Sequence, residues 1–344
     1  MTSHTDLTDL TELTGLAELA AARVGGKAIA ANDEFFAAKE NLLKAGRGVF
    51  IPGKYTSRGK WMDGWESRRR RTPGHDWCVV RLGMPGAIRG VDVDTNHFIG
   101  NFPERCSLDA CYRPGTISAA PLLGPRTEWV PLLPESRLVG GSPNLFRIAS
   151  DRVWTHVRLN IHPDGGVARL RVYGQVEVDA AALARSKRLV DLASIKNGGL
   201  VLGASDMHFG SKDNLIMPGR SANMGDGWET RRRRGPGHDW LVLRLGAPGV
   251  FARIEIDTNH FKGNYPESAS LEGCVAEASS LETLASDAPG WQEVLPRTKL
   301  GPHKRHFFAR ELVARGPFTH VRFRIFPDGG VSRLRIHGRV VTPE

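Results

Sequence analysis

Apolar and polar residues alternate along the most regular stretches of this chain. The alternation is clearest over residues 76–82 and 88–94, and it returns over residues 240–245 and 254–257. A period of two residues is typical of a strand with one buried face, whereas a surface helix repeats every 3.6 residues. The pattern therefore predicts short β-strands that each bury one side.

Turn-forming residues separate the predicted strands. Tight turns are indicated by pairs of proline and glycine at 73–74, 85–86, 236–237 and 248–249. Residues 155–174 read as a strand, a Pro-Asp-Gly-Gly turn and a second strand, and residues 319–338 repeat that order. Because glycine supplies the positive φ that such turns need, both segments predict a β-hairpin.

The chain is an internal duplication. The stretch GWESRRRRTPGHDWCVVRLGMPGAIRGVDVDTNHFIGNFPERCSLDAC, residues 64–111, matches residues 227–274 without a gap, with 30 of 48 positions identical. An opening segment repeats as well, and in both copies its composition predicts a short helix, a Gly-Gly stop and a strand of about five residues. One repeat is therefore about 160 residues long.

These patterns divide the chain into a lead-in, residues 1–15, and two repeats, residues 16–178 and 187–344. Leucines spaced by three residues between 7 and 19 indicate a short amphipathic helix or a partly ordered lead-in. The first repeat also has a longer surface loop, residues 44–59. Many short strands and little helix predict an all-β fold, with each repeat a jelly-roll β-sandwich.

Composition narrows the class of protein. The net charge of +10 permits nucleic acid as a partner, but 37 acidic residues are interspersed among 47 basic ones, so we expect no nucleic-acid binding. The N-terminus lacks a basic signal sequence, and no apolar run is long enough to span a bilayer. Four cysteines without metal-site spacing fit reduced thiols. We therefore expect a cytoplasmic protein that does not engage membranes.

The doubled GWE(S/T)RRRR-x-PGHDW, DTNHF-x-GN(F/Y)PE and PDGG motifs resemble those of the allantoicase family, over nearly the whole chain. The resemblance implies a ureohydrolase of purine degradation that converts allantoate into ureidoglycolate and urea. It also implies two tandem jelly-roll domains similar to galactose-binding modules, and a homo-oligomer.

Allantoate carries one carboxylate and two ureido arms on a single carbon, so its site needs a guanidinium fork and polar groups. The two arginine runs are candidate forks, and four asparagines are candidate partners for the ureido arms: Arg68, Arg69, Arg70, Arg71, Asn96, Asn101, Arg231, Arg232, Arg233, Arg234, Asn259 and Asn264. In an extended run, alternate arginines point to opposite sides, so about half can reach one ligand. The alternative is that each run forms a solvated basic edge.

Candidate proton-transfer groups follow the second motif. His97 with Glu104, and His260 with Glu267, combine near-neutral imidazoles with carboxylates. The alternative is that Asp94 and Asn96 hold a turn while His97 satisfies a buried carbonyl.

Glu66 and Glu229 each follow a tryptophan that can raise the carboxyl pKa. Trp65, Trp77 and Trp154 themselves are expected in the core. A metal on His75, Asp76, His97 and Glu104 stays possible, but no compact ligand spacing supports it, so no cofactor is required. No serine or cysteine nucleophile is indicated. A tandem sugar- or small-anion-binding module without turnover remains the alternative function.

Overall fold

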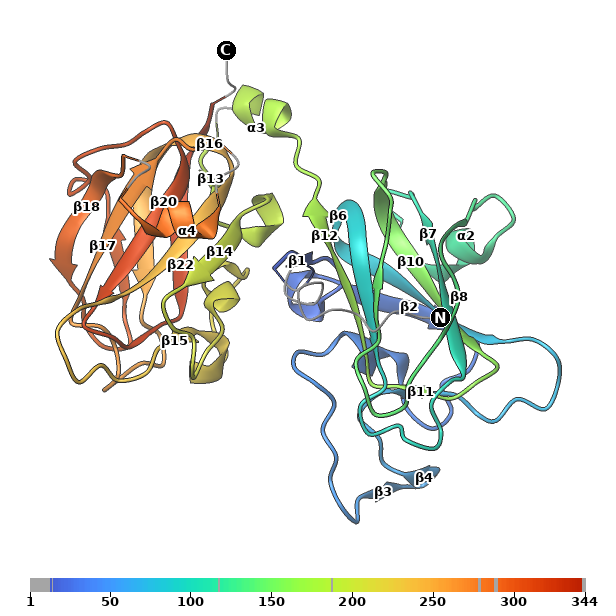
Figure 1. The fold of residues 1–344 in the computed structure, drawn as a ribbon. Helices are drawn as coiled ribbons and strands as arrows, with labels where there is room; N and C mark the ends of the chain where they lie inside the picture. The colour runs from blue at the N-terminus through green and yellow to red at the C-terminus, as the bar shows by residue number, and fades with distance from the viewer. Residues whose placement is uncertain are drawn as a thin grey trace. The chain divides into compact units, whose positions relative to one another are not determined.

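The computed structural model describes residues 13, 15–116, 118–186, 188–277, 280–287 and 290–341. The chain separates into two compact units, Met1–Glu177 and Val178–Glu344, and each is described here by itself (Figure 1). In the part of the chain that the structure describes, no helix has the length and apolar character needed to cross a bilayer.

The first unit is built around one eight-stranded antiparallel sheet. Its strands are β1 (Ala17–Glu18), β2 (Lys27–Ala31), β6 (Asp76–Asp94), β7 (Arg105–Cys111), β8 (Val130–Arg137), β9 (Leu145–Arg147), β10 (Val153–His162) and β12 (Arg169–Val176). They follow the order β1-β12-β6-β10-β7-β8, and β2 and β9 also pair with β6. The described residues of this unit also form two small ladders, β3 (Tyr55–Thr56) with β4 (Gly59–Lys60) and β5 (Trp65–Glu66) with β11 (Gly166–Val167). Short helical segments in the described part are α2 (Ala119–Leu123) and 3-10 turns at Ala22–Val24 and Lys39–Leu43.

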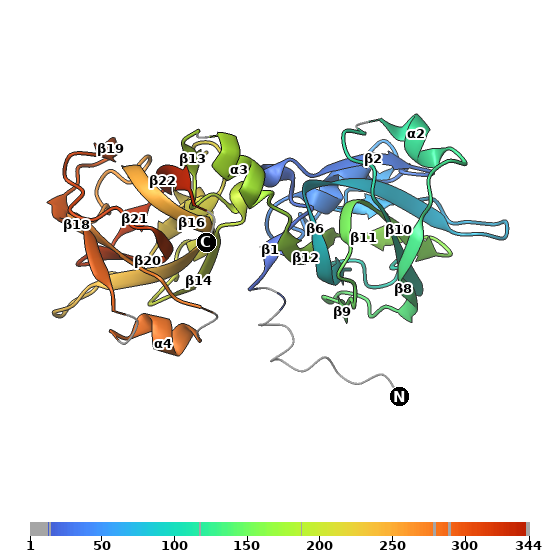
Figure 2. The same ribbon diagram turned by 90° about the horizontal axis from the view of Figure 1, so that it is seen from above.

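The second unit repeats this arrangement. Its main sheet contains β13 (Val190–Asp191), β14 (Leu200–Ala204), β16 (Asp239–Asp257), β17 (Ser268–Cys274), β18 (Gln292–Lys299), β19 (Arg305–Phe308), β20 (Phe318–Phe326) and β22 (Arg333–Val340). The other elements are β15 (Trp228–Glu229) with β21 (Gly330–Val331), α3 (Ala180–Ser186), α4 (Leu281–Ala285), and 3-10 turns at Ile195–Asn197, Lys212–Ile216 and Met224–Asp226. The order β13-β22-β16-β20-β17-β18, with β14 and β19 on β16, matches the main sheet of the first unit strand for strand. Figure 2 labels β14, β16, β18, β20 and β22 of this sheet. The predicted all-β fold, with the same topology in two tandem repeats, is confirmed.

The tight turn predicted at Pro85–Gly86 is wrong. Residues 76–94 form one continuous 19-residue strand, β6, and β16 passes through Pro248 and Gly249 in the same way. Gly86 lies against the neighbouring strand, where an added Cβ would be 2.2 Å from the Gln175 carbonyl oxygen. Glycine is therefore needed for a close approach of two backbones.

The predicted hairpins at 155–174 and 319–338 are also wrong in their pairing. β10 and β12 are strands, as expected, but they flank β6 instead of each other. After the Pro-Asp-Gly-Gly turn the chain first forms β11, which pairs with β5, and only then enters β12. β6 is long enough to pair with β10 through its first half and with β12 through its second half.

The opening helix predicted for each repeat is replaced by a two-residue strand and a single 3-10 turn. The Gly-Gly stop is real, because Gly25 ends the turn at φ 103°, and the five-residue strand follows as β2. Of the five leucines of the lead-in pattern, Leu7 and Leu10 lie outside the described residues, whereas Leu13 and Leu19 are buried and Leu16 is partly buried. In the core, Trp65 and Trp154 are fully buried as expected, whereas Trp77 is partly exposed.

Candidate functional site

One face of the second unit's sheet carries a cluster of charged side chains. Strands β16 and β22 place polar residues at alternate positions: Arg253, Glu255 and Asp257 on β16, and Arg333, Arg335 and His337 on β22. The residues between them, such as Ile254 and Ile336, are fully buried on the core side. Because side chains alternate across a strand, all six polar residues project from the face opposite the core.

The six residues stand in three cross-strand rows. The register pairs Asp257 with Arg333, Glu255 with Arg335, and Arg253 with His337. Directly opposed strand residues have neighbouring side chains, so each row forms a local contact.

Two flanking strands extend the cluster. On one side Arg305 of β19 holds Glu255 through two hydrogen bonds of 2.7 and 2.9 Å. On the other side Asp191 of β13 lies opposite His337.

A loop forms the wall over this face, and buried arginines hold it. Arg333, with a side chain 3% exposed, donates to the carboxylate and the backbone carbonyl of Asp226 and to the Gly219 carbonyl. Arg335 donates to the Gly219 carbonyl at 2.8 Å. Most hydrogen bonds of these two guanidinium groups therefore go to backbone oxygens of the loop. Because both arginines bind Gly219, they hold the neighbouring Arg220 beside Asp257, at 3.5 Å.

The face and the loop enclose a pocket of about 430 Å³. Its lining is Asp191, Ser194, Pro218, Gly219, Arg220, Arg253, Glu255, Asp257, Arg305, Arg333, Arg335 and His337. Five arginines against three carboxylates leave a formal excess of two positive charges, without counting His337. This volume lies in the range of small-ligand pockets, and the charge favours an anion.

His337 is the lining residue whose ordinary pKa lies near neutrality. Burial lowers the pKa of His337, while the neighbouring Asp191 carboxylate acts in the opposite direction. Burial likewise raises the pKa of Asp191, against the effect of Arg335. A neutral imidazole beside a carboxylate is suited to accept a proton at pH 7.

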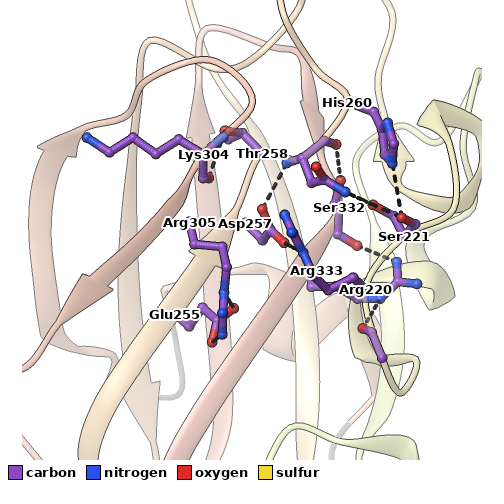
Figure 3. A network of polar contacts seen from close by, with 12 residues as sticks. Arg220, Ser221, Glu255, Asp257, Thr258, His260, Lys304, Arg305, Ser332 and Arg333 are labelled. Atoms are coloured by element: carbon purple, nitrogen blue, oxygen red, sulfur yellow. Dashed lines mark hydrogen bonds and ion pairs between the residues drawn. The ribbon is translucent and has the colours of Figure 1, made fainter.

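The second predicted motif reaches this pocket through its first residue, Asp257 (Figure 3). The Asp257 carboxylate accepts a hydrogen bond from the Asn259 backbone, and the Asn259 side chain donates to Ser221, next to Arg220. The ring of His260 contacts the Ser221 carbonyl at 3.0 Å. Asn259 and His260 therefore help to hold the pocket's loop, although neither lines the pocket.

The corresponding residues of the first repeat behave in the same way. Asn96 donates to the Gly48 carbonyl at 2.8 Å, and His97 contacts the same oxygen at 3.2 Å. This is the turn-holding arrangement that the sequence left open as the alternative for His97.

The two arginine runs lie outside the pocket lining. Arg70 binds the buried Asp76 at 2.7 Å, and Arg233 binds the equivalent Asp239 at 2.6 Å. The first arginine of each run is exposed and contacts a side chain of its own repeat: Arg68 binds Asp33, which is 13% exposed, and Arg231 contacts His208. Four further arginines are exposed: Arg69, Arg71, Arg232 and Arg234. Three arginines of each run are therefore exposed, and one per run binds a buried carboxylate.

The predicted carboxylates separate into two groups. Glu66 accepts a hydrogen bond from Asn101 at 2.7 Å, and Glu229 accepts one from Asn264. Burial raises the pKa of Glu66, whereas the bond from Asn101 opposes that rise.

Glu104 and Glu267, by contrast, are exposed. Glu267 contacts Ser268 and Arg297, where the sequence paired it with His260. Over the described ranges, no three His, Cys, Asp or Glu side chains gather as a metal site would require.

The pocket's own residues were missed because the alternation was interpreted as a solvent-facing side of each strand. A signal was present in the sequence. Every polar position in residues 253–257 and 333–337 is charged or histidine, and the two segments lie on adjacent strands. Six neighbouring charged or histidine side chains on one face of a sheet indicate a binding site more than an ordinary solvent-facing surface.

In the first repeat, Asp92 occupies the position of Glu255, and it provides a test of the electrostatics. Burial raises its pKa to about 6 from 3.8, and Asp94 adds to the rise, while the Asn144 backbone and the arginines Arg47 and Arg171 oppose it. A raised folded-state pKa means that the charged form costs stability above about pH 6, and that this cost disappears as the pH falls towards 3.8.

We therefore expect Asp92→Asn to change the pH dependence of unfolding. Relative to the variant, the original chain should gain about 2.4 kcal/mol between pH 7 and pH 4, because one unit of pKa shift is worth about 1.4 kcal/mol and the last part of the gain comes below pH 4. Denaturant titrations of both proteins across this range measure the difference. Parallel stability curves would contradict a raised pKa at Asp92.

Comparisons with known proteins agree with this architecture. The family model described as the allantoicase repeat matches residues 17–177 and 190–341. A probable allantoicase 1 of Burkholderia mallei is 51% identical over 93% of both chains, and a probable allantoicase of Ralstonia nicotianae is 49% identical over 93% of this chain and 94% of its own.

Solved structures give the same result. One described as the structure of allantoicase is 32% identical, with a TM-score of 0.82, and covers 98% of this chain and 100% of its own. The allantoicase of Saccharomyces cerevisiae is 33% identical, with a TM-score of 0.80, over 97% and 98% of the two chains. The repeated β-sheet units, their shared topology and these matches together show that the chain belongs to the allantoicase family.

Proposed function

We propose that this protein hydrolyses allantoate to ureidoglycolate and urea, as a ureohydrolase of purine degradation, in the pocket of its second repeat. The single observation that carries the site is the pocket of about 430 Å³ with two more arginines than carboxylates. Family membership supports the substrate, which is a small anion with two hydrogen-bonding arms. A net positive, polar pocket of this size matches such a molecule.

The reaction breaks one bond between the central carbon and a ureido nitrogen. Water supplies the hydroxyl that bonds to the carbon, and the departing nitrogen takes a proton and leaves as urea. The reaction therefore needs a group that accepts a proton from water and returns it to the departing nitrogen, and a group that orients the carboxylate.

The residues of the pocket divide between these tasks. Arg220 and Arg253 face the pocket with exposed side chains, and we assign the carboxylate to them. Arg305 is engaged by Glu255, while Arg333 and Arg335 are held by the loop carbonyls. His337, neutral at pH 7, is the proposed proton acceptor, with Asp191 stabilising the imidazolium that forms.

The test is urea release from allantoate by the purified chain. Steady turnover with equal amounts of urea and ureidoglycolate is expected. Saturable binding of allantoate without urea release would support the non-catalytic anion-binding module instead, and neither binding nor turnover would exclude both functions.

Finer features belong to the same proposal. We propose a cytoplasmic homo-oligomer that binds no nucleic acid, since acidic and basic residues are interspersed and the resemblance implies an assembly. We also propose that the enzyme hydrolyses the C–N bond of a ureido group in preference to other linear amidine C–N bonds. Parallel activity assays with allantoate and with a guanidino acid measure this preference.

A further inference from the structure

The first repeat contains a counterpart of the charged face. Its rows are Asp94 with Arg169, Asp92 with Arg171, and Gly90 with Tyr173. Glu18 of β1 lies opposite Tyr173, as Asp191 lies opposite His337. The loop arginine is Arg47, because the Gly46 carbonyl accepts from Arg169 as that of Gly219 accepts from Arg333. The two repeats can therefore be compared position by position.

The comparison shows a difference in charge. The counterpart positions of the first repeat hold three arginines and three carboxylates: Arg47, Arg169, Arg171, Glu18, Asp92 and Asp94. The strand equivalent to β19, β9, adds Arg147, which lies opposite Gly90. The formal sum is therefore one positive charge, against an excess of two in the pocket of the second repeat. The second repeat has Arg253 where the first repeat has Gly90, and Arg305 of β19 binds Glu255. An anionic substrate is therefore attracted more strongly to the second repeat than to the first.

In the first repeat, a packed side chain also occupies the space in front of Gly90, so that a larger residue does not fit there. An added Cβ at Gly90 would lie 2.7 Å from Cδ2 of Leu13, and Leu13 is only 3% exposed. A buried apolar side chain thus covers the place from which Arg253 faces the pocket in the second repeat. In the first repeat, Leu13 therefore fills the space that the Arg253 side chain has in the second repeat.

The loop arginines of the two repeats, Arg47 and Arg220, differ in how tightly they bind an aspartate of their own repeat. Arg47 grips Asp94 through two hydrogen bonds of 3.0 and 2.9 Å. Arg220 approaches Asp257 through one longer contact of 3.5 Å. A bidentate pair is the stronger arrangement, so Arg47 is held by its own chain while the fork of Arg220 is more easily engaged by a ligand.

We infer that the chain binds one substrate molecule, in the second repeat, that Arg253 and Arg220 take the carboxylate of this ureido acid, and that the first repeat is a closed copy of the site. This inference rests on the proposed function for the identity of the substrate. It concerns the number and place of binding sites, which the proposed activity alone leaves open.

Two matched variants test the place of binding. Arg220→Gln removes the loop arginine of the second repeat, and Arg47→Gln removes the equivalent exposed residue of the first. We expect Arg220→Gln and Arg253→Gln each to raise the KM for allantoate about 10- to 100-fold, the range for a lost charged hydrogen bond, while Arg47→Gln leaves KM unchanged. Equal increases for Arg47→Gln and Arg220→Gln, in folded proteins of equal molar ellipticity, would overturn the inference.

The number of sites is measured on the unaltered chain by isothermal titration with N-carbamoylglycine. This compound has the carboxylate and one ureido arm, but its carbon bears a single nitrogen, so it cannot expel urea by the same route. A stoichiometry of one per chain, lost in Arg253→Gln, is expected, and two per chain would be decisive against the inference. Failure of the proposed function would appear separately, as no urea release from allantoate by the unaltered chain.

Discussion

Replacing Arg169 by Met is expected to lower the free energy of unfolding of the first repeat by about 3–5 kcal/mol, the usual cost of removing one partner of a buried ion pair. The Arg169 side chain is 3% exposed and binds the Asp63 carboxylate at 2.6 Å. It also donates to the backbone carbonyls of Asp63, Ala168 and Gly46. Methionine fills much of the volume but removes the hydrogen bonds to the Asp63 and Ala168 carbonyls and leaves Gly46 only its bond from Arg171. The buried Asp63 carboxylate keeps Lys44 and the Val49 backbone but loses its arginine.

The pKa of Asp63 indicates how strongly this network favours the charged form. Burial alone would raise it, but hydrogen bonds from Arg169, the Val49 backbone and Lys44 hold the pKa below its ordinary value. The variant loses the largest of these favourable contributions.

Chemical denaturation monitored for each repeat measures the effect. The control is Arg105→Gln, which breaks the exposed pair with Glu135, whose partners are 45% and 51% exposed. Exposed pairs contribute about 0–1 kcal/mol, so this control should stay close to the original chain. A loss below about 1 kcal/mol for Arg169→Met would show that the network adds little to the fold.

The sequence predicted the parts of this fold that depend on local alternation. The two halves of β6 follow from the period-two pattern, because buried and less buried residues largely alternate along it. The strands on either side of the Pro-Asp-Gly-Gly turn, β10 and β12, were predicted as well, although β10 is buried on both faces. Their pairing did not follow, since it is decided by the 19-residue β6, which accepts both neighbours along its length. Pro85 and Gly86 looked like a turn for the same reason: sequence shows a residue's own preferences, but not that Gly86 is needed for contact with a strand 89 residues away.

The site shows the same division between local and distant information. The DTNHF motif was correctly placed where a strand meets a loop, because Asp257 ends β16 and lines the pocket. Arg253, Arg305 and His337 come from three strands and converge only through sheet register. The charged positions of 253–257 and 333–337 are visible in the sequence, but their spacing along the chain does not show that they meet. The arginine runs were predicted to bind the substrate because four consecutive arginines are prominent in the sequence. In the structure, Arg70 and Arg233 instead form ion pairs with buried aspartates of their own repeats.

Replacing His337 by Gln is expected to lower kcat for allantoate by about 10²–10⁴-fold, the usual share of a general acid or base. Glutamine has similar size and can still form hydrogen bonds, but it cannot take a proton from water. The matched control is Tyr173→Phe at the equivalent position of the first repeat, which should leave kcat unchanged because that copy of the site is closed.

The pH dependence separates a proton-transfer role from a structural one. Burial lowers the pKa of His337, Asp191 and Glu255 oppose this, and Arg253 and Arg335 add to it. Because the neutral imidazole is the active form, kcat of the original chain should be constant at pH 7–8 and fall as the pH drops through the lowered pKa, below about 6.5. The residual rate of His337→Gln should lack this acidic limb. If His337 only supports the pocket, the variant will instead keep the limb while its KM and thermal stability change, and a folded variant with full kcat removes His337 from the mechanism.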